Sequence, residues 1–233
     1  MFREGQGDGS GKVQNNGHAI AADLSNRGFG GLTLDDSEFA LQSITFHARS
    51  EHSIAGKRFP LEVHLMHKRY DGDARAIVAF LVESRISPRP ELEKVKGVGD
   101  APADARLSIF DGSIPAVMNV STVSPTELRP LDLNAWFTGA FYKYEGSLTA
   151  PPCSENVVWF VRQKPLLASN AQVKAFFSAI FEMTHDLGNA RAVLPVMGRE
   201  ISLVNAVKEE PVFDYGVQKV PWHGATRPFQ ARS

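Results

Sequence analysis

The stretch YEGSLTAPPCSENVVW runs from Tyr144 to Trp159 and contains the only cysteine of the chain, Cys153. It leads into the apolar run NVVWFV, from Asn156 to Val161, which predicts a buried β-strand. A single cysteine excludes an internal disulfide framework and a metal site made only of cysteines.

The composition indicates one large, β-rich domain. The 233 residues are 43% hydrophobic, which is enough for a sizeable core. Lys and Arg number 25 and Asp and Glu 26, so the formal charge is -1. The chain therefore has no excess of positive charge with which to bind nucleic acid. No apolar run approaches the ~18 residues of a membrane span, and the first residues contain no signal-peptide core. We expect a soluble domain with no nucleic-acid partner and no membrane span.

Outward from the opening stretch, three more segments predict strands: Glu38–Ala48, Pro60–Lys68 and Ala74–Glu83. The third is almost continuously apolar, as expected of a strand buried on both faces. The Pro- and Gly-containing region that follows is predicted to be irregular, with a short helix at Pro90–Val95.

One clear helix is predicted from about Asn170 to Met183. Ser169, with Gln172 three residues on, has the spacing of a capping box. The apolar residues then recur with helical spacing on one face, which indicates core packing and no chemistry. That stripe consists of Val173, Phe176, Phe177, Ile180 and Phe181.

The histidines are unevenly distributed along the chain. Five of the seven lie in its first third, at His18, His47, His52, His64 and His67. Because strand side chains alternate faces, Thr45 and His47 point the same way, and so do Glu62 and His64. If these strands pair, two imidazoles and a carboxylate share one patch, which is the composition of a zinc site. From the spacing alone, histidines that are hydrogen-bonded in the core or at the surface are the commoner interpretation, because histidines close in sequence often have unrelated roles.

Four stretches together resemble the α-class (eukaryotic-type) carbonic anhydrases. Tyr144–Trp159 closely matches the signature of that family, and Asn15–His18, Phe46–Leu65 and Asn189–Arg199 agree with it in the same order. The resemblance covers roughly residues 13–206. It implies a mainly β (α+β) fold with a central, twisted, mostly antiparallel sheet, a few peripheral helices, and zinc at the bottom of a conical cleft.

The resemblance also implies a role for each matching residue. His47 and His64 would be zinc ligands, and Glu62 would orient a ligand. Thr149 would accept a hydrogen bond from the zinc-bound hydroxide and donate its own hydroxyl proton to Glu51. His18 would relay protons to solvent, a task that suits an imidazole. Four residues would form the apolar wall against which CO2 rests: Met66, Ile77, Leu148 and Trp159.

The sequence departs from the family at the metal site. Thr45 occupies the position of the first zinc-ligand histidine, and Ser43 replaces the glutamine that usually orients that ligand. A threonine hydroxyl is a poor zinc donor, and losing one ligand costs ~3 kcal/mol, or about a hundredfold in affinity. Rescue by His67 is disfavoured because His67 points to the opposite face, and the resemblance gives His52 a structural place of its own.

The resemblance divides the chain into three parts: a flexible leading segment (1–12), a carbonic-anhydrase-like domain (13–206) and an extended C-terminal tail rich in proline and aromatic residues (207–233). The tail is either a solvated end or an arm that docks on a protein partner. The resemblance finds no counterpart of the family's opening segment, with its first cysteine, before residue 13, so Cys153 is expected to lack its usual disulfide partner. Either the chain is shortened or the sequence starts late.

Two functions follow from these observations. The first is a carbonic-anhydrase-like domain with an incomplete zinc site, weak or no CO2 hydration, and a structural or binding role in an assembly. The alternative is an active zinc carbonic anhydrase that converts CO2 reversibly to bicarbonate. Zinc is weakly bound or absent in the first and required in the second. The family favours a lumenal, organellar or secreted location.

Overall fold

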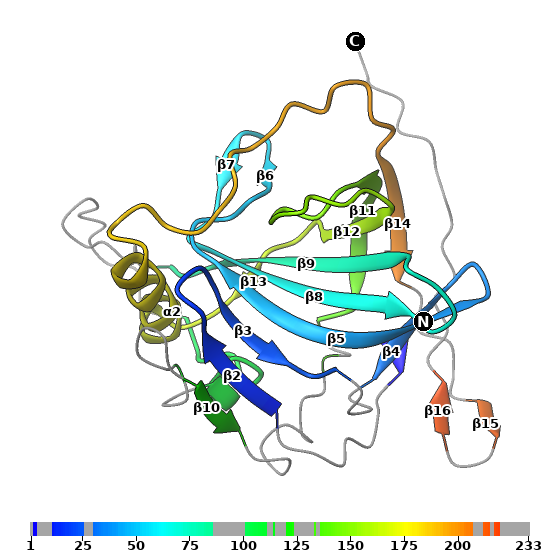
Figure 1. Ribbon diagram of the computed structural model, residues 1–233, viewed down its shortest axis with the longest axis horizontal. Coiled ribbons are helices and arrows are strands. Elements are labelled where there is room, and N and C mark those ends of the chain that lie inside the picture. The colour runs from blue at the N-terminus through cyan, green and yellow to red at the C-terminus, as the bar shows by residue number, and fades with distance from the viewer. Residues whose placement is uncertain are drawn as a thin grey trace.

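The structure is a computed structural model of residues 1–233 (Figure 1). The predicted short helix at Pro90–Val95 lies outside the residues that it describes, as does most of the tail from residue 207 on. The residues described are 2–3, 11–25, 30–85, 101–110, 114, 120–123, 133, 136–206, 212–214 and 217–219.

A large twisted sheet of twelve strands dominates the fold (Figure 1). Its main path runs in the order β10-β2-β3-β5-β8-β9-β12-β11-β14, with β1, β4 and β13 paired beside that path. The strands are β1 (Phe2–Arg3), β2 (Gly11–Asn15), β3 (Ile20–Asp23), β4 (Gly31–Leu34), β5 (Ser37–His47), β8 (Leu61–Arg69), β9 (Arg75–Glu83), β10 (Val120–Val123), β11 (Gly139–Gly146), β12 (Val157–Arg162), β13 (Leu166–Leu167) and β14 (Ser202–Ala206).

The centre of the sheet confirms the strands expected from the sequence. β5, β8, β9 and β12 coincide with the four predicted segments to within a residue or two. The sheet is mostly antiparallel, and β9 pairs in parallel with β12 and β13. Every residue of β9 between its two end residues is buried, as the apolar run predicted. The mainly β fold class is therefore confirmed.

The helix α2 (Asn170–Met183) covers one face of the sheet (Figure 1). Its bounds and its Ser169–Gln172 capping box agree with the prediction. Phe176 of α2 stacks on Phe46 of β5 with ring centroids 4.1 Å apart, so the Phe46 face of β5 belongs to the main core. Because side chains alternate, Thr45 and His47 point to the opposite face of the sheet.

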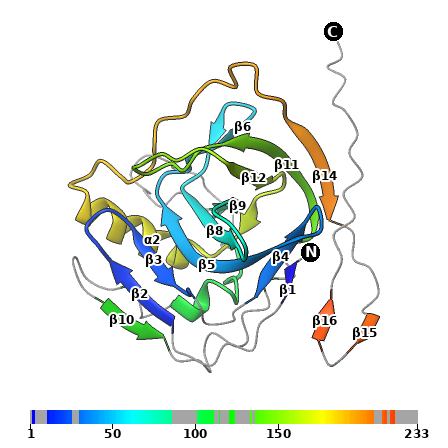
Figure 2. The same ribbon diagram turned by 45° about the vertical axis from the view of Figure 1, so that its right-hand side comes forward.

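Three smaller features complete the described fold. The hairpin of β6 (Ser53–Ile54) and β7 (Lys57–Arg58) follows β5, and in both views the segment between α2 and β14 runs past it (Figures 1 and 2). A 3-10 turn spans Ser108–Phe110. β15 (Val212–Asp214) and β16 (Val217–Lys219) pair antiparallel. Within the part of the chain described, no helix is long and apolar enough to cross a membrane.

Candidate functional site

The register between β5 and β8 assembles the predicted histidine patch. Thr45 lies directly opposite His64, and His47 lies directly opposite Glu62. The two imidazoles are therefore diagonal neighbours across the strand pair, and their ring centroids lie 4.3 Å apart. Both side chains are buried, with residue exposures of 8% for His47 and 4% for His64.

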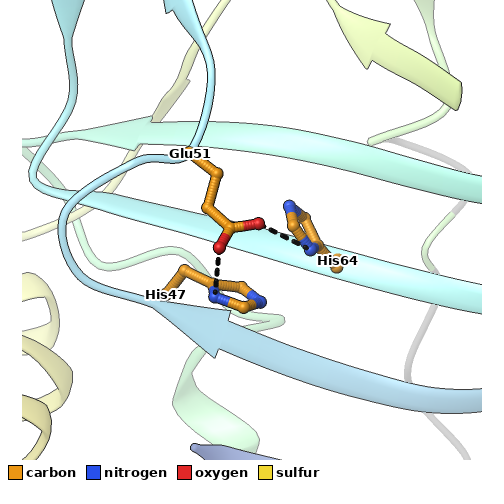
Figure 3. Close-up of side chains that lie close together, drawn as sticks. All are labelled: His47, Glu51 and His64. Atoms are coloured by element: carbon orange, nitrogen blue, oxygen red, sulfur yellow. Dashed lines mark ion pairs between the residues drawn. The ribbon is translucent and has the colours of Figure 1, made fainter. Parts of the chain in front are cut away.

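Glu51 extends over both imidazoles from the turn after β5 (Figure 3). Its Oε1 lies 3.4 Å from Nδ1 of His47, and its Oε2 lies 4.0 Å from Nδ1 of His64. The backbone N–H of Arg191 donates to Oε1 at 2.8 Å. The backbone N–H of Glu51 donates to Oε2 of Glu62 at 2.8 Å. The turn is thus fixed at both its backbone and its side chain.

Glu62 is the centre of a fully hydrogen-bonded network. Its Oε1 accepts from Nε2 of His64 at 2.7 Å and from Nδ1 of His52 at 2.6 Å. Its Oε2 accepts the backbone N–H groups of Glu51 and His52. The other ring nitrogen of His52 shares a hydrogen bond of 2.6 Å with the Tyr144 hydroxyl. Since Glu62 occupies Nε2 of His64, the Nδ1 atom of that imidazole is left facing Glu51.

The network separates the pKa values of its members. Burial, reinforced by the charge of His64, lowers the pKa of His47 to about 4. Burial works against ionisation of Glu51 and Glu62, but the neighbouring histidines outweigh it and lower the pKa of both carboxyls, that of Glu62 strongly. For His52, burial is outweighed by the Glu62 carboxylate, which raises its pKa. At neutral pH the site thus holds two carboxylates and a neutral His47.

The donor atoms of this site fit a divalent cation. One ligand atom each from His47, Glu51 and His64 can be chosen so that all lie within 4.8 Å of one another. Among the described residues, Nδ1 of His47 and Oε2 of Glu51 are buried without a hydrogen-bond partner. Such atoms are costly unless a ligand or water satisfies them. Two imidazoles and a carboxylate are a composition found in zinc enzymes.

An apolar wall adjoins the histidines. In the sheet register Met66 lies opposite Ile77, and Ile77 lies opposite Trp159. These three residues and Leu148 belong to one apolar cluster, separate from the main core. The Trp159 ring packs edge-on to His64 at 5.0 Å, and its Nε1–H donates to the carbonyl of Ser147. The structure thus brings together all four residues predicted to form the wall.

A cleft of about 210 Å³ opens above the buried histidines. Glu51, Thr149, Trp159 and Arg191 line it, together with apolar residues of the segment that precedes β14. Neither His47 nor His64 lines the cleft, so Glu51 is the member of the trio that connects them to it. A small ligand could enter here and meet a carboxylate and a hydroxyl beside an apolar surface.

Known proteins with similar sequences and folds agree with this architecture. The family model for eukaryotic-type carbonic anhydrases matches residues 3–205. The chain belongs to that family. A carbonic anhydrase of Pectobacterium atrosepticum is 34% identical over 195 residues, which cover 83% of this chain and 69% of that protein.

Two solved structures place the fold alongside this family. The α-carbonic anhydrase of Photobacterium profundum has 32% identity and a TM-score of 0.60, covering 84% of this chain and 78% of that one. Dioscorin, solved in complex with ascorbate, has 28% identity and a TM-score of 0.65, covering 90% of this chain and 80% of that one. CO2 and bicarbonate are the substrates of the carbonic anhydrase family.

The remaining predicted residues are placed less centrally. His18 lies exposed on the turn between β2 and β3, where Asn16 accepts its backbone N–H, and no contact of the described residues joins it to the histidine trio. Thr45 is half-buried on the patch face of β5. His67 is buried in the opposite face and hydrogen-bonds to the carbonyl of Ala76. The expectation that His67 points away from the patch agrees with this placement.

Three residues that support the site were not assigned a role from the sequence. Asn189 accepts the backbone N–H of Ala48 and donates to the carbonyl of Phe46, which fixes the end of β5. Arg191 holds Glu51 through its backbone N–H, and Tyr144 holds His52. The family motif in Asn189–Arg199 marked this segment, but no residue pattern indicated which strand it would contact.

Proposed function

We propose that this chain is a carbonic-anhydrase-like domain with an incomplete zinc site, which hydrates CO2 weakly or not at all and acts as a binding or structural subunit. The observation that carries the proposal is Thr45. It lies directly opposite His64, in the position where the family has its first ligand histidine. Because threonine has no imidazole nitrogen to offer, only two histidine ligands remain. A catalytic zinc site normally has three protein ligands.

The residues that remain would still hold a cation loosely. His47 and His64 would bind it, and Glu62 would keep the His64 ring oriented through its 2.7 Å hydrogen bond. A bound zinc ion would supply an activated water molecule to attack CO2. The apolar wall of Met66, Ile77 and Trp159 would exclude solvent beside it.

The proposal is tested by metal analysis of the purified chain together with a CO2-hydration assay. We expect less than one zinc per chain after dialysis against a weak chelator, and little hydration above the uncatalysed rate. The matched variant is Thr45→His, which restores the missing imidazole and should raise zinc affinity by roughly a hundredfold. Tightly bound zinc with fast, sulfonamide-sensitive turnover in the unchanged chain would refute the proposal.

The alternative, an active zinc carbonic anhydrase, is favoured by one specific observation. Thr149 lies close enough to Glu51 to lower the pKa of its carboxyl group, which fits the pair that would orient the nucleophile. Thr149→Val separates the two functions. It should reduce hydration sharply if the chain is an enzyme, and change little if the chain has no hydration activity to lose.

A binding role is supported by apolar side chains at the rim of the cleft. Met197 is 80% exposed, and Val193, Leu194, Val196 and Ile201 are exposed and line the cleft. Exposed apolar groups that gather around a cleft are typical of interaction sites.

The tail, residues 207–233, is the other proposed docking element. Its deletion should leave the domain folded and release it from its complex, whereas unfolding on deletion would assign the tail to the core.

A further inference from the structure

We infer that Glu51 is itself a metal ligand, so that His47, His64 and Glu51 form a two-histidine, one-carboxylate site for a divalent transition-metal ion. This inference rests on the proposed function in one respect, the absence of an imidazole at Thr45. It goes beyond it by giving Glu51 the role of third ligand to the cation.

The distances support a shared cation rather than direct ion pairs. Zinc binds nitrogen and oxygen at 2.0–2.2 Å, so two donors of a tetrahedral site lie about 3.4 Å apart. Nδ1 of His47 lies 3.4 Å from Oε1 of Glu51, and Nδ1 of His64 lies 4.0 Å from Oε2, the other oxygen of the same carboxylate. Both exceed the 2.7–2.9 Å of a charge-assisted hydrogen bond. The Glu51 carboxylate points toward both imidazoles (Figure 3), and one ligand atom from each of the three side chains can be chosen so that all lie within 4.8 Å of one another.

The unsatisfied atoms are the ones such a site requires. Among the described residues, Nδ1 of His47 and Oε2 of Glu51 are buried without a hydrogen-bond partner. Nδ1 of His64 is free to face Glu51 because Nε2 of the same ring is bound to Glu62. That arrangement, with one ring nitrogen on a carboxylate and the other on the metal side, is typical of metal-binding histidines.

The backbone also brings Glu51 to this position. Its N–H donates to Glu62, and its Oε1 accepts the N–H of Arg191, whereas Oε2 has no hydrogen-bond partner in the described part of the chain. Glu51 lines the cleft, whereas the two histidines lie beneath it. A carboxylate engaged by a cation is less able to orient the Thr149 hydroxyl. The site would therefore retain metal while losing the arrangement that CO2 hydration needs.

The test measures metal affinity rather than turnover. The full chain is stripped with a chelator and titrated with Zn²⁺ by calorimetry and with Co²⁺ by visible absorption, which reports the ligand set. Glu51→Gln keeps an acceptor for Arg191 but removes the charged donor, and it should weaken both ions more than roughly tenfold and alter the Co²⁺ spectrum. The exposed-carboxylate control Glu145→Gln should leave affinity within about threefold.

A double variant keeps the test decisive if Glu51→Gln is poorly folded. In a Thr45→His background a third imidazole is present, so adding Glu51→Gln should cost less affinity than it does alone. The inference is overturned if Glu51→Gln leaves the affinity unchanged, or if the control Glu145→Gln loses as much affinity as Glu51→Gln does. It is also overturned if the chain binds neither metal ion. Each of these results leaves the proposed lack of hydration standing. If the chain hydrates CO2 fast and Glu51→Gln still weakens metal binding as expected, only the proposed function is overturned.

Discussion

Glu51 and Glu62 are two buried carboxylates at one end of the β5–β8 pair, and the structure uses them in opposite ways. Both oxygens of Glu62 are taken, by two imidazoles and two backbone N–H groups. Glu51 has one oxygen on the N–H of Arg191 and the other without a hydrogen-bond partner among the described residues. The difference separates a carboxylate that fixes the fold from one that remains available to a ligand.

The adjacent histidines show the same division. His52 belongs to the Glu62 network, and the carboxylate raises its pKa despite burial. His47 belongs to the Glu51 trio, and burial lowers its pKa to about 4. A protonated His52 strengthens the network around Glu62, whereas a neutral His47 keeps its nitrogen lone pair available as a donor. The two histidines therefore contribute to stability with opposite pH dependence.

The largest expected effect tests the structural carboxylate. Glu62→Gln should lower the free energy of unfolding by about 3 kcal/mol, because two imidazoles and two backbone groups lose a charged, fully buried acceptor. The matched variant Glu51→Gln should lower it by less than about 1 kcal/mol, since Gln keeps an oxygen that can accept the N–H of Arg191. Urea unfolding at pH 7 with a chelator measures both.

The sign of the pH dependence provides a second check on Glu62. Its pKa is lowered well below the usual value, so its contribution is present above the pKa of the unfolded chain and is lost as pH falls through the folded value. The difference between the unchanged chain and Glu62→Gln should therefore shrink in acid. Similar losses for Glu51→Gln and Glu62→Gln at pH 7 would remove the distinction between the two carboxylates.

Strand alternation alone predicted which side chains share the patch, because Thr45, His47, Glu62 and His64 lie on regular strands whose faces follow from the sequence. It did not predict the division between the two carboxylates. The position of Glu51 depends on the turn after β5, which is held by Arg191, about 140 residues away in the chain. Likewise Tyr144 reaches His52 from β11, a half-buried strand whose mixed residues carry no strong period. Such long-range contacts are fixed by tertiary packing.

The next expected effect concerns His47. With a pKa of about 4 when folded and 6.5 when unfolded, it favours folding above pH 6.5, and this contribution is lost as pH falls toward 4. Between pH 7 and pH 5 the free energy of unfolding should fall by about 2 kcal/mol on account of this residue. His47→Gln should remove that part of the slope.

The measurement is urea unfolding at several pH values in chelator, with the buried His67 as the internal comparison. His67 has a pKa that burial likewise lowers to about 4, so its own share of the acid slope should remain in His47→Gln. His52→Gln should change the pH dependence of the free energy of unfolding in the opposite direction. The raised pKa of His52 gives a contribution that is present at low pH and is lost as pH rises through the folded value. Identical pH profiles for the chain and His47→Gln would show that His47 is already accessible to protons.

The smallest expected effect tests how far the Glu62 network extends. Tyr144→Phe removes only the hydroxyl that bonds His52 at 2.6 Å and keeps the ring that lies parallel to Trp159 at 6.1 Å. One such hydrogen bond is worth about 1 kcal/mol, so the free energy of unfolding should fall by about that amount. Thr149→Val, on the Glu51 side of the cleft, should change it by less than about 0.5 kcal/mol. If the two losses were equal, Thr149 would be as firmly built into the fold as Tyr144. The residues around Glu51 would then form a structural network like that of Glu62, and Glu51 would have no oxygen available to bind a cation.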